Sequence, residues 1–203
     1  MIDTILFDFG AVLYEWAPDR FVAALRQNPE EARVLRAMID GPDWVSMDRG
    51  QVDQDTALAS MLDKLPVDFH ADMETLVRHW YRLGNPIPEM GALASDLLDR
   101  GYRVFLFSNI NETFERILAQ KLVPVLDRFT GLGLSYKLSA VKPEPEIFQA
   151  MRMSFDLQPE RCFFIDDRAD NISAAKDYGM SGYVFAGDVA DLRNVLTSVG
   201  VRT

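Results

Sequence analysis

Short apolar runs alternate with amphipathic segments over most of the chain. The first apolar run, Ile5-Leu6-Phe7, is followed directly by Asp8, and Gly10 lies two residues further on. A β-rich run that ends near a turn glycine is typical of a buried strand leading into a loop. Further strands are predicted at 102–109, 131–136, 161–167 and 181–187, and helices at 91–101, 112–122, 144–155, 169–179 and 188–199. This alternation predicts an α/β protein with a parallel sheet covered by helices on both faces.

Residues 14–86 show a different pattern, with apolar residues at helical spacing. Four amphipathic helices are predicted, in the segments FVAALRQ, EEARVLRAMI, DTALASMLDKL and METLVRHWYRL, with turns at 41–44 and 48–53. The sequence NPIP at 85–88 predicts an extended return to the sheet, because residues before proline avoid the helical conformation. We therefore predict an α/β core domain, residues 1–13 and 87–203, and a small helical cap domain, residues 14–86, placed as a lid beside the sheet.

The composition agrees with one globular domain that carries a small insertion. The chain has 203 residues, 48% of them hydrophobic, and a formal net charge of −10. Such an acidic chain is not expected to bind nucleic acid or an anionic membrane surface, so an anionic substrate would need positive charge from a metal ion or a lysine. The single cysteine, Cys162, excludes an intrachain disulfide and a cysteine-built zinc site. Without a basic leader or an apolar run of ~18 residues, a cytoplasmic protein is expected.

Polar residues follow several of the apolar runs. They are Asp8, the pair Ser108-Asn109, Lys142 and the pair Asp166-Asp167. Because the carboxyl ends of parallel strands share one edge of a sheet, where ligands bind, we expect these residues to gather there. Taken alone, each also has an ordinary explanation, as a strand-end cap, a helix N-cap, a solvated surface lysine and an exposed turn, respectively.

Together these residues suit phosphate chemistry around a magnesium ion. The adjacent carboxylates Asp166-Asp167 repel each other unless a cation lies between them and Asp8, and oxygen-only ligation is what Mg²⁺ prefers. Gly10 lets the backbone turn, so its carbonyl is a candidate for a further oxygen ligand. Ser108 offers a hydroxyl to phosphoryl oxygens, and Lys142 offers charge that lets an anionic nucleophile approach an anionic ester.

These motifs resemble those of the haloacid dehalogenase superfamily, in the subgroup with a helical cap inserted after the first strand. ILFDFGAVL is similar to the first family motif, LFSN to the second, the lysine of VKPEPEIF to the third and FIDDRADN to the fourth. The resemblance spans nearly the whole chain and implies a Rossmann-like core and a Mg²⁺-dependent phosphatase acting on a small phosphorylated metabolite. The pattern is most similar to the branch that contains bacterial α-D-glucose-1-phosphate phosphatases, so a sugar phosphate is a candidate substrate.

The resemblance also implies a role for each matched residue. Asp8 would be the nucleophile that forms an aspartyl-phosphate. Ser108 and Lys142 would be catalytic residues that bind the phosphate together with Asn109. The Mg²⁺ site would comprise Asp8, the Gly10 carbonyl and the pair Asp166-Asp167.

One position departs from the family pattern. Most phosphatases of this family carry a second aspartate two residues after the nucleophile, as general acid and then base, whereas this chain has Gly10 there. General acid–base catalysis is worth ~10²–10⁴-fold, so three explanations stay open: a leaving group that departs unassisted, replacement of the acid by a cap residue or water, or slow turnover. Cap residues are natural substrate selectors, although bundle packing or solvent exposure also explains the candidates, Trp16, Arg20, Trp44 and Arg49.

Two other functions stay open. A 2-haloacid dehalogenase also lacks the second aspartate, but in that branch the nucleophile attacks carbon without Mg²⁺ and uncharged residues replace the acidic pair. Asp166-Asp167 therefore favours phosphate chemistry. A non-catalytic relative that binds a phosphorylated ligand or a protein is favoured by Gly10 alone. His70 and His79 lie on predicted cap helices and are not expected to be catalytic, and the sequence predicts neither the substrate nor the oligomeric state.

Overall fold

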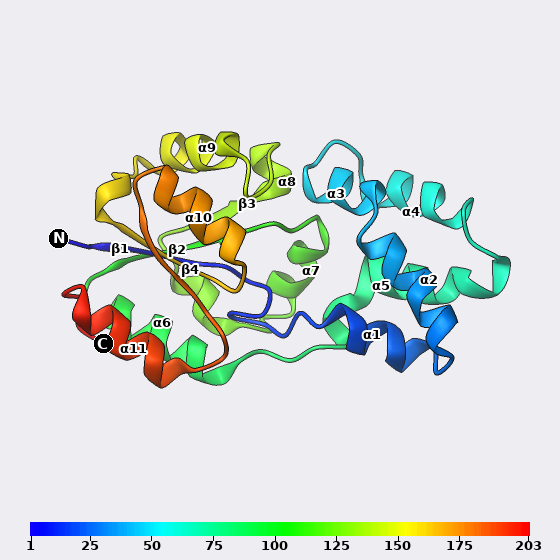
Figure 1. The fold of residues 1–203 in the computed structure, drawn as a ribbon, viewed down its shortest axis with the longest axis horizontal. Coiled ribbons are helices and arrows are strands. Elements are labelled where there is room, and N and C mark those ends of the chain that lie inside the picture. The colour runs from blue at the N-terminus through cyan, green and yellow to red at the C-terminus, as the bar shows by residue number, and fades with distance from the viewer.

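A five-stranded parallel sheet forms the centre of the fold in the computed structural model, which describes residues 1–203 (Figure 1). The strand order is β3-β2-β1-β4-β5. The strands are β1 (Thr4–Phe7), β2 (Arg103–Ser108), β3 (Gly131–Leu134), β4 (Cys162–Asp166) and β5 (Ser181–Val184). Phe7 pairs with Leu106 of β2 and Ile165 of β4, so the residues that follow these three strands emerge at one edge. The predicted α/β class is confirmed.

Helices cover both faces of the sheet, because successive side chains of a strand point to opposite faces. On β2, Val104 and Leu106 belong to the apolar cluster that includes residues of α6 (Pro88–Asp99), α7 (Thr113–Ala119) and α11 (Val189–Ser198). Phe105 and Phe107 belong to the cluster formed with α9 (Pro145–Phe155) and α10 (Ala169–Asp177). The remaining helical segments of the core are α8 (Ser135–Leu138) and the 3₁₀ turns η3 (Pro124–Arg128) and η4 (Pro159–Arg161).

The segment between β1 and β2 forms an inserted helical cap. It contains α1 (Pro18–Leu25), α2 (Pro29–Ile39), α3 (Pro42–Asp48), α4 (Gln54–Leu62) and α5 (His70–His79), with 3₁₀ turns η1 (Val67–Phe69) and η2 (Trp80–Arg82). These helices gather at one end of the molecule, beside α7 and α8 (Figure 1). None of the helices has the length and apolarity needed to cross a membrane. The boundaries 14–86 stay a prediction.

The structure corrects two local predictions. The segment 41–44, predicted as a turn, contains the start of α3, so the cap has five α-helices where four were predicted. Proline suits the first position of a helix, and Pro42 is followed by Trp44 and Met47, which are buried at helical spacing. For the same reason Pro88, predicted to end an extended linker, begins α6.

Candidate active site

Asp8 follows β1 directly and lies at the sheet edge. Its backbone N–H donates to the carbonyl of Ile165 over 2.9 Å, which extends the β1–β4 pairing by one residue. The Asp8 side chain is buried. The loop that follows turns differently from the prediction, because Ala11, with φ 56°, adopts the left-handed conformation and Gly10 does not. Space at Gly10 is nevertheless tight, because a Cβ atom there would lie 3.1 Å from Cβ of Trp16.

Lys142 is buried at the centre of the site. Its Nζ lies 2.9 Å from Oδ1 of Asp8 and 2.6 Å from Oδ2 of Asp166, and it donates to the Phe107 carbonyl over 2.9 Å. The rings of Phe107 and Phe164 lie 5.4 and 5.0 Å from Nζ. Burial acts to lower the pKa of Lys142, but the charges of Asp166 and Asp8 outweigh it, so the pKa is raised. Lys142 is therefore a buried ammonium, and the explanation as a surface lysine is wrong.

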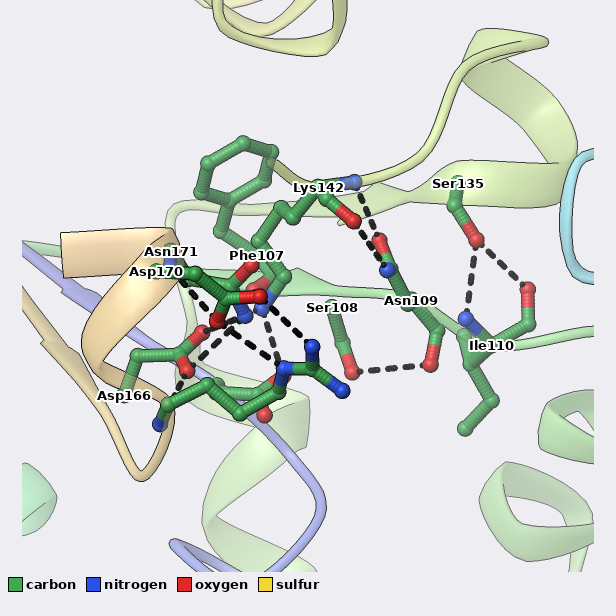
Figure 2. Close-up of polar contacts among 11 residues, drawn as sticks. Phe107, Ser108, Asn109, Ile110, Ser135, Lys142, Asp166, Asp170 and Asn171 are labelled. Atoms are coloured by element: carbon green, nitrogen blue, oxygen red, sulfur yellow. Dashed lines mark hydrogen bonds and ion pairs between the residues drawn. The ribbon is translucent and has the colours of Figure 1, made fainter. Parts of the chain in front are cut away.

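Asp166 and Asp167 are adjacent but differ in environment. The Asp166 carboxylate is fully buried and accepts hydrogen bonds from the backbone N–H of Arg168, the side chain of Asn171 and Lys142. Figure 2 shows Asn171 turned toward Asp166. The Asp167 side chain is exposed and forms no ion pair; partial burial and the charge of Asp166 raise its pKa. Asp166 is thus fixed by donors, whereas Asp167 is available to a ligand.

The pair Ser108-Asn109 is placed at the same edge. The Asn109 side chain donates to the Lys142 carbonyl over 2.9 Å and accepts from the Lys142 backbone N–H over 2.7 Å (Figure 2). Asn109 therefore fixes the Lys142 loop, and its side chain is not free for a substrate. Ser108 is buried, and its hydrogen bonding to Asp8 acts to lower the pKa of that carboxyl. Neither residue caps α7, whose N-cap is Glu112, so the explanation as an N-cap is wrong.

The donor set at this edge fits a hard divalent cation. Asp8, Asp166 and Asp167 each offer a carboxylate oxygen, and these oxygens all lie within 4.8 Å of one another. Burial raises the pKa of Asp8 to about 6; Lys142 opposes this shift and Asp166 adds to it. Oδ1 of Asp8 faces Lys142 without the alignment of a hydrogen bond and is otherwise unpartnered. A cation with oxygen ligands would satisfy this buried atom.

A cavity of about 570 Å³ opens over the site between the core and the cap. From the core it is lined by Asp8, Gly10, Ser108, Asn109, Lys142 and Asp167, and from the cap by Trp16, Arg36, Asp40, Trp44 and Asp48, among others. Of the predicted cap selectors, Trp16 and Trp44 line the cavity while also packing together, with ring centroids 5.8 Å apart. Arg20 pairs with Glu15, and Arg49 pairs with Glu144. His70 and His79 lie outside the cavity lining.

Two polar residues that shape this site, Asn171 and Asp48, are not among the candidates predicted from the sequence. Asn171, which holds Asp166, lies within the FIDDRADN motif, so its position one turn after the acidic pair was a usable signal. Asp48, the last residue of α3, lines the cavity from the cap. It fell at the start of a predicted turn, and nothing in the local pattern shows that this turn faces the sheet edge.

Comparison with known proteins agrees with this geometry. The model of a family described as haloacid dehalogenase-like hydrolase matches residues 2–179. The chain belongs to this hydrolase family. The hydrolase is 27% identical over 208 residues to a D-ribitol-5-phosphate phosphatase of Bacteroides thetaiotaomicron, covering 98% of each chain. It is 22% identical to a sesquiterpene phosphatase of Aspergillus oryzae, covering 96% of this chain and 95% of that one.

Solved structures share the fold of this hydrolase. A haloacid dehalogenase family enzyme of Bacteroides thetaiotaomicron, solved in complex with magnesium and inorganic phosphate, superposes with a TM-score of 0.74 at 24% identity. The superposition covers 95% of this chain and 99% of that chain. The Rossmann-like core with an inserted helical cap is therefore the fold of this family.

Proposed function

We propose that this hydrolase is a Mg²⁺-dependent phosphomonoesterase that acts through an aspartyl-phosphate on Asp8. One observation carries the proposal: Asp8 is buried against the ammonium of Lys142, and its carboxylate lies within 4.8 Å of oxygens from Asp166 and Asp167. Two similar proteins, named as phosphatases of a polyol phosphate and of a sesquiterpene, act on phosphorylated small molecules, which supports the same class of substrate here.

The ligands proposed for Mg²⁺ are Asp8, Asp167 and the Gly10 carbonyl. Asp166 lies beside them but is already bonded by Lys142, Asn171 and the Arg168 backbone, so we assign it the role of holding Lys142. When bound, Mg²⁺ supplies positive charge that offsets the repulsion between Asp8 and an anionic phosphoryl group. The relative that was solved with magnesium and inorganic phosphate supports this choice of cation.

Each residue of the site has a separate role in the proposed hydrolysis. The Asp8 carboxylate attacks phosphorus, the bond to the leaving oxygen breaks, and water later attacks the aspartyl-phosphate to release inorganic phosphate. Lys142 and the Ser108 hydroxyl bind phosphoryl oxygens and stabilise the charge that develops on them. Asn109 keeps Lys142 in place through its two hydrogen bonds to the Lys142 backbone.

The cavity favours a small substrate with both apolar and polar surface. Its walls combine tryptophan rings, Trp16, Trp44 and Trp80, with the charged side chain of Arg36. A sugar or polyol phosphate can stack its carbon–hydrogen face on such rings while its hydroxyl groups bond to polar residues. We propose a small phosphorylated metabolite, with a sugar phosphate as the first candidate.

Phosphate release from a panel of sugar phosphates, polyol phosphates and aryl phosphates tests this function directly. We expect turnover with Mg²⁺, loss of turnover on chelation, and loss of at least ~10³-fold in Asp8→Asn, since the nucleophile is removed. Asp99→Asn, which changes an exposed aspartate paired with Arg128 on the outer surface, is the matched control and should leave turnover unchanged.

Two results would contradict this function. Phosphate release that survives both chelation and Asp8→Asn would exclude the mechanism. Metal-independent halide release from 2-chloropropionate would identify a dehalogenase, and failure of beryllium fluoride to bind at Asp8 would favour a non-catalytic protein.

A further inference from the structure

Cleavage of an alkyl or sugar phosphate is accelerated when the departing oxygen receives a proton, and the cavity offers few sources of one. Four carboxyl side chains line it: Asp8, Asp40, Asp48 and Asp167. Asp8 attacks phosphorus, and Asp167 is a proposed Mg²⁺ ligand. Asp40, at the C-cap of α2, is exposed and already forms an ion pair with Arg36 of that helix. Of the four carboxyl groups, only that of Asp48 has no proposed role as nucleophile or metal ligand and forms no ion pair.

The loop after β1 cannot carry the proton itself. Gly10, two residues after Asp8, has no side chain, and the space beside its Cα is occupied by Trp16. A Cβ atom added at Gly10 would lie 3.1 Å from Cβ and 3.4 Å from Cγ of Trp16. A side chain at this position would press against Trp16, and the glycine itself carries no proton, so the proton donor is sought elsewhere in the cavity.

Asp48 is held rigidly at the boundary between the cap and the core. Asn111, which also lines the cavity, donates from Nδ2 to Oδ1 of Asp48 over 2.8 Å. The Ser135 hydroxyl donates to the Asp48 carbonyl over 2.5 Å. The next residue, Arg49, forms a two-pronged ion pair with Glu144, with both N–O distances 2.5 Å. Three separate core segments therefore fix the end of α3, and with it the carboxyl group.

The surroundings of Asp48 suit a group that both gives and takes a proton. Burial raises its pKa to about 7, and hydrogen bonds from Asn111 and Trp44 oppose this shift. The charged side chains of the cavity, Arg36, Asp40, Lys142, Asp167 and Arg168, form no ion pair with Asp48. A general acid–base works best when its pKa lies near the working pH.

We propose that Asp48, on the cap, is the general acid–base of this hydrolase. In the first step the Asp48 carboxylic acid donates its proton to the leaving oxygen as the bond from phosphorus to that oxygen breaks and the bond from Asp8 to phosphorus forms. In the second step the Asp48 carboxylate accepts a proton from the water that attacks phosphorus, the Asp8 carboxylate departs, and the acid is restored. The assignment rests on the proposed phosphatase function.

Asp48→Asn tests this role, because it keeps the acceptor for Asn111 and removes the proton. With an alkyl or sugar phosphate we expect the rate of the first turnover to fall by ~10²-fold or more. With p-nitrophenyl phosphate, whose leaving group departs without a proton, the first turnover should stay fast. Phosphoenzyme should then accumulate, visible as a burst of nitrophenol and as one added phosphoryl group in the intact mass. Asp43→Asn on the same helix, which faces Ser60 and Lys64, is the matched control.

Asp48→Ala supplies a second measurement, since added formate should restore part of the lost rate with alkyl phosphates in a dose-dependent way. The assignment is overturned if Asp48→Asn slows alkyl and aryl first turnovers equally, if it behaves like Asp43→Asn, or if formate has no effect on Asp48→Ala. Failure of the phosphatase function itself is recognised separately, because the wild-type protein would then release no phosphate.

Discussion

At the residue scale, the site is a cluster of charged groups in which the carboxylates outnumber the ammonium groups. Two buried carboxylates, Asp8 and Asp166, share the single ammonium of Lys142, and Asp167 adds a further negative charge at the rim. Removing ions from water costs free energy that only close partners offset. Burial raises the pKa values of Asp8 and Asp167, and the charge of Asp166 adds to both shifts. The proposed divalent cation would offset the negative charge of this cluster.

The raised pKa of Asp48 predicts how the stability of the protein depends on pH, and this prediction can be tested without an activity assay. Its pKa is raised from 3.8 to about 7, so between these pH values the folded protein binds a proton that the unfolded chain does not. This contribution to stability is full below pH ~4 and is lost as pH rises through ~7. Asp48→Asn removes the free-energy cost of ionising this buried carboxyl group. Since the side chain is partly accessible, we expect a gain of only ~1–2 kcal/mol at pH 8, or a few degrees in Tm.

Thermal unfolding of both proteins from pH 4 to pH 8 measures this effect. The difference in Tm should grow through the window from pH 4 to pH 7 and then level off. A difference that is constant across the whole range would mean that the Asp48 carboxyl titrates normally, and that burial does not shift its pKa.

At the element scale, the loop after α3 sets how the cap meets the core. Gly50 has a φ of 71°, and a Cβ atom there would lie 2.2 Å from the Tyr136 carbonyl oxygen in α8. We expect Gly50→Ala to push this loop away from α8, weaken the Arg49–Glu144 contact and misplace Asp48. The expected result is a loss of ~1–3 kcal/mol in stability together with a reduced kcat/KM.

Gly101→Ala is the matched control for Gly50→Ala. Gly101 also has a positive φ, of 85°, but no atom lies within 4 Å of the added Cβ. Both variants carry the backbone penalty, so the difference between them isolates the clash with Tyr136. Unchanged kcat/KM in Gly50→Ala, measured beside Gly101→Ala, would show that the contact between this loop and α8 does not position the site.

The sequence predicts the elements that are determined by a pattern within their own segment, such as a run of apolar residues. The strands of the core and the polar residues at their ends, such as Asp8 and Asp166, lie where the sequence predicts, because apolar runs and parallel topology determine which edge they share. Helix α3 is not predicted, because a proline after a glycine is typical of a turn although Pro42 also suits the start of a helix. The position of Asp48 over the site depends on contacts between distant segments, such as Asn111 and Ser135. No pattern within the cap records these contacts.

At the scale of the whole molecule, the cavity belongs to neither part alone. The core supplies Asp8 and Lys142, while the cap supplies the tryptophans and Asp48. The ion pair of Arg49 with Glu144 and the hydrogen bond of Asn111 with Asp48 join the two parts at the cavity wall. Under the proposed function, chemistry and substrate selection would therefore both depend on how the cap is placed over the core.

Binding of Mg²⁺ should stabilise the whole fold, because the acidic cluster joins residues at the ends of β1 and β4, which are neighbours in the sheet. A ligand at 100 times its Kd stabilises the native state by ~2.7 kcal/mol, which corresponds to ~5–10 °C in Tm for a chain of this size. We expect such a rise with MgCl₂ and not with NaCl of equal ionic strength. Asp167→Asn should reduce the rise, because this variant removes the exposed ligand but keeps the Lys142 ion pairs. If MgCl₂ and NaCl shift Tm equally in both proteins, the carboxylates do not share an ion and the buried charge has to be balanced in another way.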